Sequence, residues 1–258
     1  MFELTKWYLD LVTDQGTAVV AYMATCRLGT MAFSYASVLV APPGMPAVED
    51  STGGRVDPPQ RVGERLRWQS EALGFQGEWS PLGPAIQQTL LDGPEGGIHW
   101  TCHLPRSRAH ARLGERDLEG LGYVERLRLT LPPWRLPFRS LRWGRHLSLE
   151  HSLVWIDWAR GTDRRWVWLD ARPEPAAELT PAGVWGLSDG QSLRLHPPAV
   201  LRDRRVLERL GRALPEWLRA RLGPLAGMRE QKWLARSEIE NDGTPCDAGW
   251  AIYEEVTW

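Results

Sequence analysis

The 258-residue chain has little cysteine, and the three cysteines that it has, Cys26, Cys102 and Cys246, form no CxxC pair. An odd number of widely spaced cysteines argues against a disulfide framework and against a thiolate zinc site. A reducing compartment fits this usage best. We therefore expect a cytoplasmic protein.

The chain also lacks an excess of one charge and a long apolar run. Its 31 Lys and Arg against 32 Asp and Glu give a formal net charge of -1, so the balance gives no support for a nucleic-acid partner. The most apolar stretch, 17–43, is interrupted by Arg27-Leu28-Gly29 and predicts two strands joined by a turn rather than a membrane span. The first eight residues lack the basic and apolar regions of a secretory signal.

Signature motifs of several enzyme classes are missing. The sequence has no GxSxG, no P-loop, no GxGxxG before a helix, no HExxH and no kinase-type motif. Covalent hydrolase and nucleotide chemistry therefore lack support. We expect a site without cofactors, formed by side chains that strand alternation places together.

Polar and apolar residues alternate along most of the chain, which predicts a mainly β protein. Asp14-Gln15-Gly16, 160–163 and Ser188-Asp189-Gly190 have the residues typical of hairpin turns, and no pattern of parallel βαβ units is visible. The fold class that we predict is all-β, with antiparallel barrels. The expected strands are 7–12, 19–26, 31–40, 65–68, 98–104, 123–131, 153–158, 165–169, 232–239 and 250–258.

Proline-rich segments suggest how the chain is organised. Residues 41–63 are rich in proline, glycine and acidic side chains and predict a long loop. Pro132-Pro133-Trp134, followed by Pro137, ends a strand and divides the chain into domains 1–137 and 138–258.

One segment, about 201–222, has an apolar stripe typical of a helix beside many arginines. Its basic face indicates solvent exposure. Peripheral contact with a membrane surface is the alternative.

Glu125 is placed on the apolar face of its strand. In 123–131, Arg126 and Arg128 occupy one face, whereas Tyr123 and Glu125 share the other with three leucines. Burial disfavours an ionised carboxylate and can leave it protonated at neutral pH, so Glu125 is a candidate general acid. The alternatives are a carboxylate paired with a buried arginine and a solvated strand end.

Fifteen tryptophans are more than a core of this size requires. Several have strand spacing, Trp155 and Trp158 in one strand and Trp166 and Trp168 in the next. Tryptophan faces can line an apolar cavity and stabilise a carbocation by about 2 kcal/mol for each desolvated contact. We expect most of them in the core or barrel wall and a minority, Trp155 among them, against a ligand.

In 98–104, alternation places Trp100 and Cys102 on one face and His99 and His103 on the other. The two histidines lack a third ligand at recognisable spacing, so we predict no metal site. Trp100, Cys102 and His103 are candidate substrate contacts.

Two aspartates also lie in apolar strands. Asp157 shares a side with Leu153 and Trp155 and is a candidate substrate contact, although its closeness to the 160–163 turn favours a solvated or turn-bonding role. Asp10 shares a face with Tyr8 and is equally ambiguous. Tyr8 is a further candidate substrate contact.

Three short segments carry a resemblance to a known family: Lys6-Trp7-Tyr8-Leu9-Asp10, Trp100-Thr101-Cys102 and Gly122-Tyr123-Val124-Glu125. Together they resemble the hydroxyneurosporene synthase family of carotenoid 1,2-hydratases and its lipocalin-like relatives, which include tocopherol-cyclase-like proteins and Diels-Alderases. The resemblance implies two lipocalin-like β-barrel domains with a ligand pocket near their junction. It also implies acid-catalysed addition of water to an isoprenoid double bond.

The Tyr-x-Asp pair of this family falls on Tyr123 and Glu125, with glutamate in place of aspartate. The chain departs from the family at Ile98, where a His-x-Trp element would have histidine, and at Leu127-Arg128-Leu129, which replaces Asn-Trp-Gly.

Three functions remain open. The first is an acid-catalysed hydratase or cyclase acting on an isoprenoid-like or polyene substrate, with Glu125 and Tyr123 as its catalytic pair. The second is a pericyclic, Diels-Alder type cyclase that uses the pocket as a template. The third is a carrier of a hydrophobic ligand without catalysis.

Overall fold

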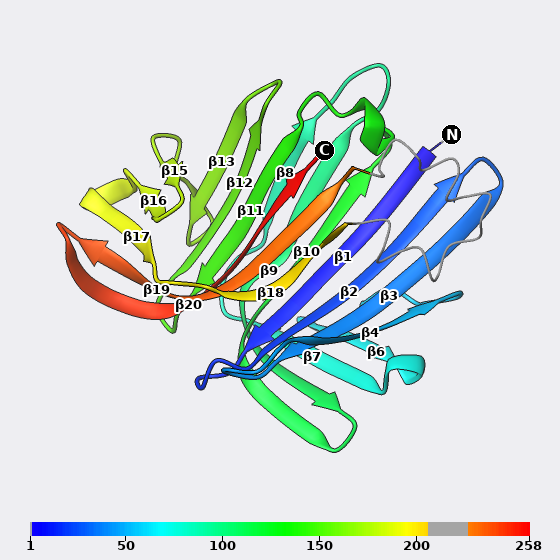
Figure 1. Cartoon of the computed structure of the whole chain (residues 1–258), viewed down its shortest axis with the longest axis horizontal. Helices are drawn as coiled ribbons and strands as arrows, with labels where there is room; N and C mark the ends of the chain where they lie inside the picture. The colour runs from blue at the N-terminus through cyan, green and yellow to red at the C-terminus, as the bar shows by residue number, and fades with distance from the viewer. Residues whose placement is uncertain (1, 206–226) are drawn as a thin grey trace. The chain divides into compact units, whose positions relative to one another are not determined.

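The computed structural model describes residues 2–205 and 227–258 (Figure 1). These residues form an all-β protein of two antiparallel, ten-stranded sheets. The predicted fold class is confirmed. Each sheet is curled, as a half-barrel is.

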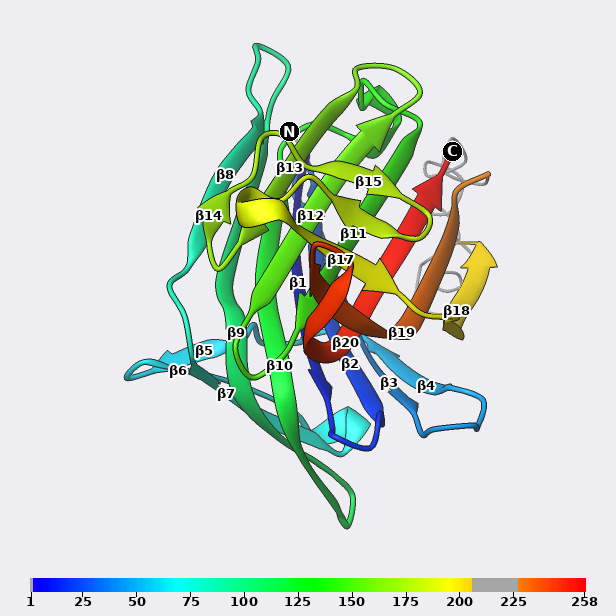
Figure 2. The same cartoon turned by 90° about the vertical axis from the view of Figure 1, so that its left-hand side faces the viewer.

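The first sheet has the order β4-β3-β2-β1-β10-β9-β7-β6-β5, and β8 also pairs with β9. The long strands β9 and β10 run side by side (Figure 2). Its strands are β1 (Phe2–Val12), β2 (Ala18–Leu28), β3 (Met31–Ala41), β4 (Val48–Gly53), β5 (Gln60–Val62), β6 (Arg65–Ser70), β7 (Phe75–Pro81), β8 (Ile86–Leu91), β9 (Ile98–Leu113) and β10 (Arg116–Leu129).

The second sheet has the order β14-β13-β12-β11-β20-β19-β17-β16-β15, and β18 also pairs with β19. Its strands are β11 (Ser140–Leu147), β12 (Ser152–Ala159), β13 (Arg164–Leu169), β14 (Arg172–Pro173), β15 (Glu178–Thr180), β16 (Gly183–Trp185), β17 (Gln191–Leu195), β18 (Ala199–Arg205), β19 (Arg229–Asn241) and β20 (Thr244–Thr257). Short 3-10 turns lie at Glu71–Leu73, Pro133–Arg135 and Ser188–Gly190.

The two sheets share one topology. Each strand of the second sheet occupies the position of the strand numbered ten lower in the first, so β11 and β20 pair as β1 and β10 do. The described chain accordingly divides into two compact units, one ending at Leu136 and the other beginning at Pro137. The proline-rich segment 132–137 lies at this boundary.

One face of each sheet carries an apolar core cluster. In the first unit, residues such as Trp7, Leu9, Trp79 and Val124 form the core cluster. In the second, Leu153, Trp155 and Ile239 belong to a smaller one. Alternation along the strands decides which residues enter these cores.

Two segments have a structure other than the one predicted for them, and seven further strands among the described residues, β7, β8, β11, β14, β15, β16 and β17, are not among those predicted. The helix predicted for about 201–222 is wrong at its start, because Leu201–Arg205 end strand β18, and the remainder lies outside the described residues. Pairing with β19 and a buried ion pair between Arg202 and Glu230, 2.6 Å apart, favour the strand. The predicted loop 41–63 contains two short strands, β4 and β5. In the described ranges, no helix has the length and apolar character needed to cross a membrane.

Gly144 provides a test of the second sheet. A Cβ at this position would lie 2.1 Å from Cζ2 of Trp155, because the indole ring lies against the glycine backbone. We expect Gly144→Ala to lower the free energy of unfolding by about 1–3 kcal/mol, as overpacking does. Urea unfolding measures the change. Gly83→Ala is the control, since no atom lies within 4 Å of its added Cβ, and equal stability losses in both variants would contradict the prediction.

Candidate functional site

Glu125 lies on β10, on the sheet face opposite the first core cluster. Its neighbour Val124 packs within that cluster, so the Glu125 side chain points the other way. In the strand register, Glu125 is opposite Tyr8 of β1 and Cys102 of β9. Glu125 is only 7% exposed. It is a buried carboxylate, as strand alternation predicts.

Two neutral groups donate hydrogen bonds to the same oxygen of Glu125. The Tyr123 hydroxyl donates to Oε2 at 2.7 Å, and the Trp100 indole Nε1 donates to Oε2 at 2.5 Å. Tyr123 lies two residues before Glu125 on β10, so both side chains point to the same face. Trp100 lies on the neighbouring strand β9. The structure thus brings together both predicted catalytic residues and one predicted substrate contact.

The groups beside Glu125 remain protonated. Burial raises the pKa of Tyr123 well above its usual range, and the nearby Cys102 and Glu125 add to this effect. Burial likewise raises the pKa of the Cys102 thiol well above its ordinary value, and the Cys102 Sγ donates to the Val124 carbonyl at 3.6 Å. Tyr123 can therefore act as a hydrogen-bond donor at any physiological pH.

A second buried carboxylate, Asp10, belongs to the same face. Asp10 is 1% exposed and lies opposite Tyr123 in the β1–β10 register. Its charge, together with that of Glu125, contributes to the raised pKa of Cys102, so both carboxylates lie near this thiol. In the sequence, Asp10 shares a strand face with Tyr8. This pattern alone could not show whether the Asp10 side chain is buried or solvated.

Aromatic residues continue this face across β1, β2 and β3. Tyr22 is opposite Tyr8 in the register, and the Tyr8 ring lies edge-on to Tyr123 with centroids 6.1 Å apart. Tyr22 also contacts Tyr35 edge-on at 6.2 Å. The sequence analysis missed Tyr22 and Tyr35, because a tyrosine in an apolar strand has no local feature that marks it as part of a site.

His103, a predicted substrate contact, lies on the opposite face of β9 from Cys102. Its ring stacks on Trp7, a member of the first core cluster, with centroids 5.0 Å apart. His103 therefore does not join Glu125. One-residue alternation separates the two faces.

Trp155 and Asp157, two further predicted substrate contacts, lie on β12 in the second unit. Trp155 packs in the second core cluster. The Asp157 carboxylate accepts hydrogen bonds from Arg142 Nη2 at 2.5 Å and from Arg165 Nε at 3.0 Å. From the sequence, Asp157 was expected either to contact a substrate or to be solvated or bonded to the nearby turn. Its carboxylate instead forms ion pairs with arginines of the two neighbouring strands.

A polar cavity of about 910 Å³ lies elsewhere in the first unit. None of the residues around Glu125 lines it. Its lining is mainly polar and includes Gln76, Glu78, His110 and Arg112, so it does not resemble the apolar pocket expected from the sequence. No group of three His, Cys, Asp or Glu suited to a metal ion occurs in the described part of the chain.

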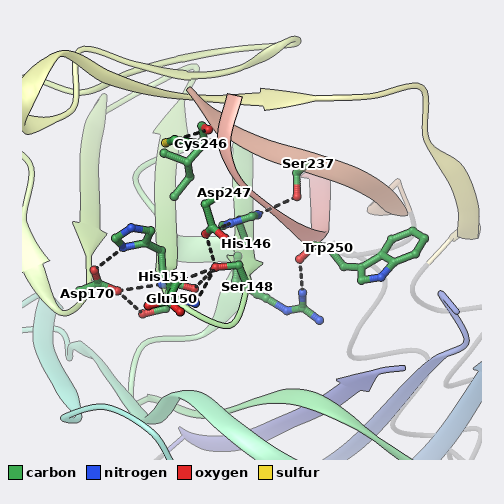
Figure 3. Close-up of polar contacts among 12 residues, drawn as sticks. His146, Ser148, Glu150, His151, Asp170, Ser237, Cys246, Asp247 and Trp250 are labelled. Carbon is green, nitrogen blue, oxygen red and sulfur yellow. Dashed lines mark hydrogen bonds and ion pairs between the residues drawn. The ribbon is translucent and has the colours of Figure 1, made fainter. Parts of the chain in front are cut away.

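A polar network connects strands β11, β19 and β20 of the second unit (Figure 3). His146 Nδ1 lies 2.7 Å from the Ser237 hydroxyl, and His146 Nε2 lies 4.0 Å from Asp247 Oδ2. Ser148 donates to the same Asp247 oxygen. Ser237 is only 1% exposed, which favours a structural role for this serine, histidine and aspartate rather than nucleophilic catalysis.

Comparisons with known proteins reveal similarity at the level of fold. No family model matches the sequence, and no curated protein matches it. Several solved structures are similar over nearly the whole chain. A candidate AttH protein from Nitrosomonas europaea is 14% identical with a TM-score of 0.63, covering 99% of this chain and 92% of that one.

Two other solved structures are similar. CghA is 11% identical with a TM-score of 0.60, covering 99% of this chain and 88% of its own. Kievitone hydratase from Nectria haematococca is 10% identical with a TM-score of 0.55, covering 98% and 88%. At these identities the likeness establishes the fold alone.

The His146 network predicts a pH dependence of stability. Burial lowers the pKa of His146 below its ordinary value, outweighing the nearby Asp247 carboxylate. The unfolded chain then binds more protons than the folded one below about pH 6.5, so stability is lost as the pH falls through this range. We expect His146→Asn to flatten the slope of unfolding free energy against pH between 7 and 5.

Urea unfolding at each pH measures this slope. His99→Asn, which changes an exposed histidine of β9, serves as the control and should keep the wild-type slope. An unchanged slope in His146→Asn would show that another group governs the acid sensitivity.

Proposed function

We propose that this protein is an acid-catalysed hydratase or cyclase that acts on a hydrophobic, isoprenoid-like or polyene substrate. Glu125 is the proton donor and Tyr123 positions it. The observation that supports this assignment is the convergence of Tyr123 Oη and Trp100 Nε1 on a single carboxyl oxygen, Oε2.

In the proposed mechanism the proton is on Oε1 of Glu125, because Oε2 accepts the hydrogen bonds from Tyr123 and Trp100 and so takes the part of the carbonyl oxygen. The π electrons of a substrate alkene form the new C–H bond to this proton, and the O–H electron pair stays on Glu125. A carbocation results at the neighbouring carbon.

The surrounding residues stabilise both charges. The negative charge that develops on Glu125 strengthens the hydrogen bonds from Tyr123 and Trp100, which are already in place. Aromatic faces such as Trp100 and Tyr8 can stabilise the cation by about 2 kcal/mol for each desolvated contact. Water then adds to the cation and loses a proton to give an alcohol, or an internal nucleophile closes a ring.

The fold neighbours are compatible with this class of chemistry. One of them is a hydratase, and CghA has been crystallised with Sch210972 (TM-score 0.54). A pericyclic cyclisation beside the same residues is the second candidate. The neutral state of Tyr123 and Cys102 is compatible with a substrate that needs only to be oriented.

Glu125→Gln tests the acid directly. The amide oxygen can take the position of Oε2 and keep both hydrogen bonds, but the amide cannot donate an acidic proton, so turnover should fall by about 10²- to 10⁴-fold. The substrate is first identified by mass spectrometry of the apolar compound that co-purifies with the protein, and its conversion is then measured. Glu119→Gln, an exposed glutamate of the same strand, should retain activity. Turnover in Glu125→Gln within a few fold of wild type would exclude the acid mechanism.

The pH profile separates the two candidates. A general acid acts only while its carboxyl is protonated, so activity should decline as this group titrates with rising pH. A template for pericyclic closure should give a flat profile over the same range, and single-turnover rates in a series of buffers distinguish the two. A flat profile together with active Glu125→Gln would favour the template.

A further inference from the structure

The polar cavity of the first unit has no part in the proposed reaction. Its volume of about 910 Å³ lies within the range of about 300–1,000 Å³ that is usual for small-molecule sites. Its walls come from strands β5, β6, β7 and β9 and from the segments 52–58 and 70–72. The side chains of this lining determine what the cavity can bind.

A row of polar side chains crosses four neighbouring strands in this cavity. The strands β5, β6, β7 and β9 lie side by side in the first sheet (Figure 2). Gln60 of β5 is opposite Arg67 of β6, which is opposite Glu78 of β7, and Glu78 is in turn opposite His110 of β9. Glu78 is half-buried and the other three side chains are exposed, so a ligand in solution can reach the whole row.

A second row lies beside the first. Gln69 of β6 is opposite Gln76 of β7, and Gln76 is opposite Arg112 of β9. All three side chains are exposed and line the same cavity. Trp68 and Ala111, which lie between the two rows in the sequence, belong to the first core cluster, so the side chains of both rows point away from that core.

The charges of the lining are balanced. The charged side chains that line the cavity are three arginines and three acidic residues, Arg55, Arg67, Arg112, Asp57, Glu71 and Glu78. Arg67 forms an ion pair with Glu78, and Arg112 donates to both oxygens of Asp117 at 3.1 and 3.2 Å. Because the lining has no excess of either sign, electrostatic complementarity favours an uncharged ligand.

Hydrogen-bond donors and acceptors lie next to each other along both rows. Each glutamine amide has a carbonyl acceptor and an NH2 donor, and the Arg67–Glu78 ion pair places guanidinium N–H groups beside carboxylate oxygens. Among residues 2–205 and 227–258, the amides of Gln60, Gln69 and Gln76 have no hydrogen-bond partner. A hydroxyl group both donates and accepts, so a ligand with many hydroxyl groups matches this lining.

The spacing of the strands indicates the length of such a ligand. Neighbouring strands lie about 4.8 Å apart, so the row from β5 to β9 spans about 14 Å. A pyranose unit of an extended oligosaccharide is about as long as one strand spacing. A tetrasaccharide therefore places one sugar unit at each strand of the row.

The segment 52–58 forms a fixed wall of the cavity. The Trp68 indole Nε1 donates to the Asp57 carbonyl oxygen at 3.0 Å, and Val56 packs against the first core cluster. These contacts hold the segment against β6 and the core. A wall that is already ordered lowers the entropy cost of binding.

We propose that this cavity binds a neutral, extended oligosaccharide. Its hydroxyl groups accept hydrogen bonds from Arg67, Arg112 and the glutamine NH2 groups, and they donate to Glu78 and the glutamine carbonyl oxygens. The site is separate from Glu125 and does not depend on the proposed reaction.

NMR titration of the full chain tests the proposal with three neutral tetrasaccharides, cellotetraose, mannotetraose and xylotetraose. The side-chain NH2 signals of Gln69 and Gln76 report on the cavity, and each is assigned by its loss in the corresponding alanine variant. We expect at least one of the three tetrasaccharides to shift both signals with a saturable dependence on concentration. The NH2 signal of Gln87, an exposed residue of β8 outside the cavity, should not move.

Alanine variants provide a matched comparison. Gln69→Ala and Gln76→Ala each remove an amide that can form two hydrogen bonds to the sugar, so each should weaken binding about tenfold. Gln87→Ala should keep the affinity within about twofold of wild type. All three side chains are exposed, and urea unfolding verifies that the variants remain folded. The absence of a saturable shift with every tetrasaccharide, or equal affinity losses in the three variants, would overturn the proposal.

Two further probes test the class of ligand. Inorganic phosphate is the probe for an anion site, and tetraalanine is the probe for a peptide site, since a peptide backbone also donates and accepts hydrogen bonds. Neither should shift the Gln69 and Gln76 signals at the concentration at which the tetrasaccharide saturates them. Equal or larger shifts with phosphate would identify an anion site, and with tetraalanine a peptide site, and either result would exclude a saccharide site.

Discussion

The pairing of the first strand of each unit with its last strand is the constraint on which the rest of the structure depends. In the first unit, β1 and β10 are adjacent in the sheet although more than a hundred residues separate them. Their hydrogen-bonded register places Tyr8 opposite Glu125 and Asp10 opposite Tyr123. Because side chains alternate along both strands, one register assigns every one of these residues to the same face.

This strand pair separates two kinds of polar chemistry. On one face, Glu125 accepts hydrogen bonds from neutral donors and is surrounded by tyrosines. On the other, the His103 ring stacks on Trp7 and the Arg126 guanidinium lies over the same indole ring. The two faces of one sheet thus separate the carboxyl group of Glu125 from the imidazole of His103 and the guanidinium of Arg126. A register shift of one residue would move each side chain to the opposite face.

The duplicated topology shows that the position of Glu125 does not by itself imply catalysis. In the second unit, Glu254 of β20 is opposite Trp143 of β11 and Lys232 of β19, the strands that correspond to those around Glu125. Lys232 forms an ion pair with Glu254 and lies 5.3 Å from the centroid of the Trp143 ring. A buried carboxylate next to a lysine is a charge-compensated structural element, whereas the hydrogen bonds that Glu125 accepts from Tyr123 and Trp100 come from neutral donors.

The sequence by itself determined ten of the twenty strands in the described part of the chain, the turn at Asp14-Gln15-Gly16 and the inward direction of Glu125, because these follow from alternation and local backbone preferences. Tertiary structure alone decided that Trp100 hydrogen-bonds Glu125, that Asp157 is held by two arginines, and that His103 faces away from the acid. It also decided that Leu201–Arg205 form a strand. The physical reason is that these contacts join separate strands, so they depend on a hydrogen-bond register that spans the sheet and leaves no mark on the periodicity of any one segment.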